Sequence, residues 1–117
     1  MKNPKIVEEI KRDILGEEYD LSFAFITKSK IKQLNNKFRE KNEPTDVLSF
    51  ALSATSGELL ICQDIAKLKS KSFNMSAQEY LIFLVIHGLL HLKGLDHGAK
   101  MEAYELSYHS RYRRRHL

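Results

Sequence analysis

The feature that most limits the possible folds of this chain is one apolar helix with clear ends. Ser76 and Glu79 have the spacing of a capping box, in which each side chain satisfies a backbone donor at a helix start. All residues from Leu81 to Ile86 are apolar, and Gly94 is a natural helix end. A helix that is apolar nearly all round belongs in the middle of a hydrophobic core. We therefore expect this helix to lie at the centre of the fold.

The remaining predicted elements are short. We expect helices at residues 4–15, 29–41, 63–71 and from about 100 onward, and strands at 21–27, 46–52 and 58–62. A turn-forming stretch separates the last two strands, which should be neighbours in one sheet. Strands followed by helices indicate an α+β fold, here a small mixed β-sheet packed with helices. A chain of 117 residues, 43% hydrophobic, can build one such core but not two, so we expect a single domain over residues 1–117.

Charge and cysteine content indicate a partner and a compartment. The net charge is +4, and cations cluster in residues 28–41 and at Arg111, Arg113, Arg114 and Arg115. Such clusters suit phosphate backbones, although a frayed, solvated tail explains the second cluster equally well. The single cysteine, Cys62, fits a reducing cytosol. No signal peptide or membrane-spanning run is visible, so we expect a cytoplasmic protein.

Three histidines form the candidate chemical centre. His87 and His91 lie four residues apart on the apolar helix, so both rings project from one face, one turn apart. Gly94 lets the chain turn back and bring His97 within reach. The alternative, satisfied core and loop histidines, leaves two unpaired imidazoles in an apolar helix at a cost of about 1–3 kcal/mol each. Three imidazoles leave one coordination position of zinc open, as in catalytic sites. We predict one Zn²⁺ per chain, although imidazoles also bind nickel, copper and iron.

The histidine spacing is that of the long zincin signature, His-Glu-x-x-His-x-x-Gly-x-x-His, and predicts a zincin-like core helix that carries the ligands. Gly88 occupies the position of the glutamate that serves as general base in the peptidases. A peptidase working by the usual route is therefore disfavoured, and the sequence does not identify a general base.

Two segments form longer motifs. Residues 87–97 read His-Gly-Leu-Leu-His-Leu-Lys-Gly-Leu-Asp-His, and residues 34–50 end in Pro-Thr-Asp-Val-Leu-Ser-Phe. The first looks like the metal motif, and the second is similar to another signature, of the YbeY family, bacterial endoribonucleases that act in ribosomal RNA maturation and ribosome quality control. The resemblance implies zinc on the three histidines and a functional role for Arg39, whose guanidinium fork can grip phosphate oxygens.

The expected function is zinc-dependent, single-strand-specific cleavage of RNA. The resemblance implies ribosomal RNA or the ribosome as partner, with ribosomal proteins as further candidates and neither DNA nor a membrane expected. A non-catalytic, zinc-containing ribosome-assembly factor remains the main alternative, and a metallopeptidase is a weaker one. Asp96, beside His97, is a candidate hydrogen-bond acceptor for a ligand imidazole, or alternatively a helix or loop cap. Thr45 and Asp46 are candidates for a similar orienting role or for a polar turn or strand start. Five phenylalanines fit core positions better than a base-stacking platform: Phe23, Phe25, Phe38, Phe50 and Phe83.

Overall fold

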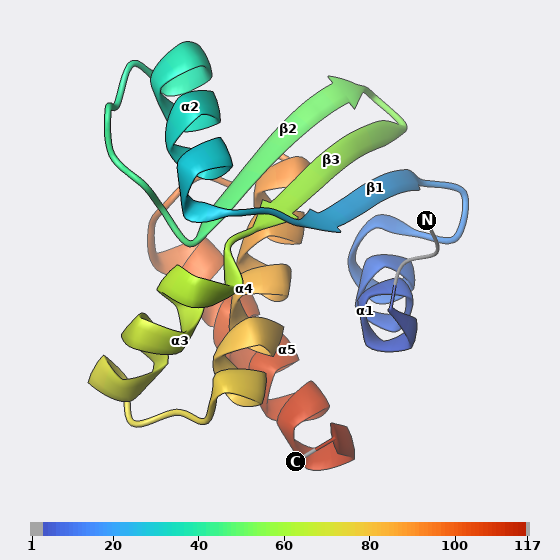
Figure 1. Cartoon of the computed structure of the whole chain (residues 1–117). Helices are drawn as coiled ribbons and strands as arrows, with labels where there is room; N and C mark the ends of the chain where they lie inside the picture. Colours follow the sequence, from blue (N-terminus) through green and yellow to red (C-terminus); the bar gives the residue numbers. More distant parts are fainter. Residues whose placement is uncertain (1–3, 117) are drawn as a thin grey trace.

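The fold is a small sheet between helices. The computed structural model describes residues 4–116. The elements, labelled in Figure 1, are α1 (Lys5–Leu15), β1 (Asp20–Phe25), α2 (Lys28–Arg39), β2 (Val47–Ser53), β3 (Ser56–Ile61), α3 (Gln63–Ser72), α4 (Ala77–Leu92) and α5 (Ala99–His116).

The sheet is mixed and has the order β1-β3-β2. β1 runs parallel to β3, with Phe23 opposite Leu59, and β2 runs antiparallel to β3, with Leu48 opposite Leu60. The predicted α+β class with a small mixed sheet is therefore confirmed. β2 is an edge strand, and this position brings it next to the candidate site.

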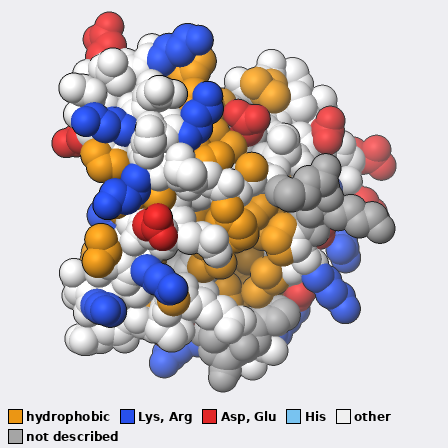
Figure 2. Space-filling view, viewed as in Figure 1, with side chains coloured by type: hydrophobic (Ala, Val, Ile, Leu, Met, Phe, Trp, Pro, Cys, Tyr) orange, Lys and Arg blue, Asp and Glu red, His pale blue; other side chains and the backbone are white. Residues whose placement is uncertain are grey.

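Helix α4 lies at the centre of the core, as its composition predicts. Its buried side chains pack with α1, α5 and the Leu59 face of the sheet, whereas α2 covers the opposite face around Leu48 and Leu60. Cys62 belongs to this second cluster and is fully buried. Hydrophobic side chains are visible over the middle of the molecule, beneath the sheet (Figure 2). No single helix within residues 4–116 is long and apolar enough to span a membrane; α3 and α4 meet those criteria only as a pair bent by 107°.

The start of α4 corrects one detail of the sequence analysis. The Ser76 side chain accepts a hydrogen bond from the Glu79 backbone nitrogen at 3.1 Å, which is half of the predicted capping box. The Glu79 carboxylate does not return the bond; it lies 3.4 Å from both His109 Nε2 and Arg113 Nε on α5. The cationic Arg113 guanidinium attracts the carboxylate more strongly than a neutral backbone donor does.

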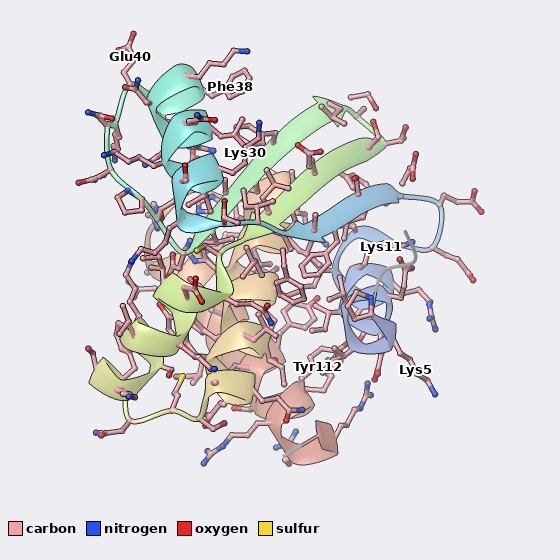
Figure 3. The ribbon with its side chains drawn as sticks, in the orientation of Figure 1. Lys5, Lys11, Lys30, Phe38, Glu40 and Tyr112 are labelled. Carbon is pink, nitrogen blue, oxygen red and sulfur yellow. The ribbon has the colours of Figure 1, made fainter. Side chains whose placement is uncertain are left out.

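The C-terminal cations form part of the packed structure. Arg111 lies 3.3 Å from Asp13 of α1, and Arg115 lies 2.7 Å from Glu9. The Tyr112 hydroxyl also donates to Asp13 where α5 meets α1 (Figure 3). The frayed-tail interpretation is therefore wrong, and these carboxylate partners reduce the charge that this end of α5 offers to a polyanion.

Candidate metal centre

The structure brings the three candidate ligands together. His87 and His91 project from one face of α4, and Gly94, with φ of 103°, turns the chain so that His97 approaches them. The ring centroids lie 4.6 Å apart for His87 and His91, 5.3 Å for His87 and His97, and 4.8 Å for His91 and His97. One ring nitrogen from each residue lies within 4.8 Å of the others. A single ion can therefore contact all three rings.

Hydrogen bonds on the outer side of two rings fix which nitrogens are available. His87 Nδ1 lies 3.2 Å from Glu105 Oε2, and His91 Nδ1 lies 3.0 Å from the Leu95 carbonyl oxygen. Because a carbonyl or carboxylate oxygen accepts, each Nδ1–H is the donor, and each neutral ring keeps a lone pair on Nε2.

The inner nitrogens fit a divalent cation. The two Nε2 atoms of His87 and His91 face each other at 3.2 Å. Burial, and then the neighbouring His87, hold the pKa of His91 below its usual value, which favours the neutral ring. The Nε2 lone pairs of two neutral rings at this distance would repel each other, and a metal ion held by both nitrogens would remove that repulsion. The donor set, imidazole nitrogens alone, is one that zinc accepts.

Glu105 is a site residue that the sequence analysis missed. Within residues 4–116, no hydrogen bond joins Asp96 to His87, His91 or His97, so Asp96 is not the acceptor for a ligand imidazole. Glu105 performs the corresponding task for His87 from α5. A signal exists in the sequence, because Glu105 is the one carboxylate on the inward stripe of α5, made by Met101, Glu105, Tyr108 and Tyr112. A carboxylate on a buried stripe requires a partner.

The histidines open into a cleft of about 320 Å³ that carries cationic side chains. Its cations are Arg39 and Lys41, from the end of α2 and the loop that follows, and Lys69 from α3; the carboxylates of Glu43 and Asp46 line it as well. Cations gathered around a cleft raise the local concentration of anions such as phosphate.

Arg39 lies on the wall of this cleft at the free edge of β2. Its Nη2 donates to the Ser49 carbonyl oxygen at 2.9 Å, and the guanidinium carbon lies 5.7 Å from the centre of the Phe50 ring. Its positive charge also contributes to lowering the pKa of His91. The structure thus places the predicted arginine beside the histidines and holds it there by two contacts.

Gly88 lies at a close approach between α4 and the sheet. A Cβ atom at this position would lie 2.3 Å from Cδ1 of Leu59, whose side chain is fully buried. A glutamate at position 88 therefore has no space unless the core shifts. The absence of the peptidase base follows from the packing of α4 on β3.

Asp46 does more than begin a strand. It is 6% exposed, accepts a hydrogen bond from the Tyr80 hydroxyl at 2.7 Å and lies 3.5 Å from Lys69 Nζ. Burial and this carboxylate raise the pKa of Tyr80. Asp46 thus connects the α4 core to a cation of the cleft, a long-range link that its polar sequence context does not reveal.

Comparisons with known proteins identify the family to which the chain is similar. A family model described as Endoribonuclease YbeY matches residues 3–114. Proteins of that name from Thermosipho melanesiensis and Staphylococcus epidermidis are 35% and 36% identical over 80% and 74% of this chain, and over 69% and 65% of their own lengths. The chain thus spans about two thirds of these curated relatives. The solution structure of TM1509 from Thermotoga maritima is 30% identical, with a TM-score of 0.66 over 96% of this chain and 82% of that one.

Proposed function

Because this chain belongs to the YbeY family of endoribonucleases, we propose that His87, His91 and His97 bind one zinc ion and that the adjoining cleft cleaves single-stranded RNA. The observation that carries the proposal is the pair of inner nitrogens 3.2 Å apart, with a third imidazole beside them and a cationic cleft in front. Three protein ligands leave one zinc position for chemistry. A structural zinc would usually be closed by a fourth protein ligand, and this disfavours the assembly-factor alternative.

The protein's own residues bind and orient the phosphodiester. Zinc, when bound, supplies Lewis-acid stabilisation of a phosphoryl oxygen and lowers the pKa of water toward about 7. Arg39 presents its remaining N–H donors to phosphate oxygens, and its contacts with Ser49 and Phe50 restrict its motion before RNA arrives. Lys41 neutralises a neighbouring phosphate along the strand, whereas Asp46, 3.5 Å from Lys69 Nζ, offsets part of the charge that Lys69 offers there.

We further propose ribosomal RNA as the substrate, in maturation and quality control, with ribosomal proteins as possible contacts and the cytoplasm as the location. The substrate and the contacts follow the family resemblance, and the location follows the cysteine content. Buried, unpaired Cys62 is compatible with a reducing compartment.

The test combines metal analysis with RNA cleavage by matched variants. We expect one equivalent of zinc in the wild type, little in His91→Ala, and a normal amount in Arg39→Ala. Cleavage should disappear in His91→Ala and fall about 100- to 1,000-fold in Arg39→Ala, the usual effect of removing one donor to developing charge. His109→Ala is the control, because His109 contacts Glu79 away from the cleft.

Two outcomes would contradict the proposal. Full cleavage by His91→Ala would show that a contaminating ribonuclease is responsible. Zinc-loaded protein that binds ribosomal RNA but cleaves nothing would favour the assembly factor. A casein assay tests the peptidase alternative, for which we expect no activity because position 88 provides no base.

A further inference from the structure

Phe38 is exposed although its helical spacing predicts a core position. It lies in the last turn of α2 and projects toward β2 (Figure 3). Its exposed fraction is 56%, so the core prediction is wrong, and Phe25, at 37%, departs from it as well. The Phe50 ring supports Phe38 from β2, with centroids 5.3 Å apart and planes inclined by 62°. We call Phe38 and Phe50 the aromatic pair.

Arg39 links the aromatic pair to the cleft. The Arg39 guanidinium lies 5.7 Å from the Phe50 ring centre and also lines the cleft that contains the histidines. Lys37 Nζ lies 5.2 Å from the centre of the Phe38 ring. Lys and Arg side chains are spread over the α2 side of the molecule (Figure 2). An exposed, supported ring is therefore flanked by cations on a path that leads to the candidate metal centre.

We propose that the aromatic pair is a stacking site for one unpaired nucleobase of an RNA strand whose backbone passes Arg39 into the cleft. The proposal rests on the proposed function and adds a binding site to it. Unpaired bases stack on aromatic side chains whatever their sequence, because every base has a π face, while neighbouring cations hold the phosphates. In a duplex the bases are stacked on one another and cannot reach Phe38. The site therefore selects single strands.

The first experiment compares two exposed phenylalanines. We would measure the dissociation constant of zinc-loaded protein for a short single-stranded RNA carrying 2′-O-methyl groups that resist cleavage. Phe38→Ala should weaken binding about 5- to 150-fold, whereas Phe38→Tyr should retain it. Phe73→Ala is a matched control, since Phe73 is 59% exposed and stacks on Tyr80 with centroids 5.6 Å apart. Phe38→Leu keeps apolar contact with Phe50 without a π face, and it should bind as weakly as Phe38→Ala with an unchanged melting temperature.

Two further measurements separate stacking from charge and from misfolding. The slope of binding constant against salt should be unchanged in Phe38→Ala, whereas Arg39→Ala should reduce its magnitude by about 0.7 for one lost phosphate contact. The second measurement uses a series of RNAs in which one abasic nucleotide occupies each position in turn. At one position the missing base should weaken wild-type binding as much as Phe38→Ala does. At that same position it should not weaken the binding of Phe38→Ala any further.

Equal affinities of the wild type, Phe38→Ala and Phe73→Ala would overturn the stacking site while leaving the proposed nuclease intact. An equal loss of affinity for duplex RNA would also overturn it. Wild-type protein that neither binds nor cleaves RNA would refute the proposed function itself.

Discussion

Replacing Glu105 by glutamine isolates its effect on the metal centre. The change keeps the size and an acceptor oxygen but removes the negative charge that faces His87 Nδ1 at 3.2 Å. Glu105 is 12% exposed and His87 21% exposed, so solvent screens this contact only partly. A carboxylate on the outer nitrogen fixes ring orientation and strengthens the imidazole as a ligand.

The expected loss is 10- to 100-fold in zinc affinity, or about 1.4–2.7 kcal/mol. The metal-free protein should change in unfolding free energy by less than about 0.5 kcal/mol, because the glutamine oxygen still accepts the Nδ1–H bond. Glu105→Leu removes the acceptor and should weaken zinc further, with about 1 kcal/mol of lost stability.

Competition with a chromophoric chelator measures the affinity, and ¹⁵N spectra of the imidazoles report which nitrogen carries hydrogen. Glu102→Gln is the control, because it makes the same charge change at an exposed position of α5. The reasoning is refuted if Glu105→Gln binds zinc as tightly as the wild type, or if Glu102→Gln loses as much affinity.

Three further predictions concern packing, burial and protonation. Gly88→Ala should lose up to about 2 kcal/mol in urea unfolding, because overpacking against Leu59 outweighs a helix-propensity gain of about 1 kcal/mol; greater stability than the wild type would contradict this. Tyr80→Phe should cost about 1.5–3 kcal/mol, the value of a hydrogen bond to a charged group, and a loss below 0.5 kcal/mol would mean that Asp46 finds another donor. Because the pKa of His91 is lowered in the folded protein, the unfolded chain binds a proton at this residue at a higher pH than the folded protein does. The unfolding free energy of the metal-free protein should therefore be highest above pH 6.5 and decline as the pH falls toward the lowered pKa. His91→Gln should flatten that decline, and an unchanged slope would contradict the assignment.

Local signals account for the parts of the fold that could be predicted. Ser76 and Gly94 mark the ends of α4, because capping acts within a few residues. The apolar composition of the whole helix places it in the core. The partner of the Glu79 carboxylate could not be predicted, since His109 and Arg113 reach it only after α5 packs on α4.

The candidate site likewise combines features set by local sequence with features set by tertiary packing. The spacing of His87 and His91 is fixed by the helix itself, so their convergence is readable from the sequence. Glu105 depends on the docking of α5, and the exposure of Phe38 depends on which residues of α2 pack on the sheet, where Ile31 is buried and Phe38 is not. Such tertiary features leave only weak traces in a single sequence.

The contact between Arg39 and Ser49 also bears on solubility. An open strand edge is a template on which another chain can pair and aggregate. β2 has such an edge and carries Leu52, which is 66% exposed. Arg39 covers one acceptor of that edge with a charged group. Shortening this side chain therefore exposes the strand edge to self-association and also removes a phosphate ligand. In such a variant, a loss of activity has to be distinguished from aggregation of the protein.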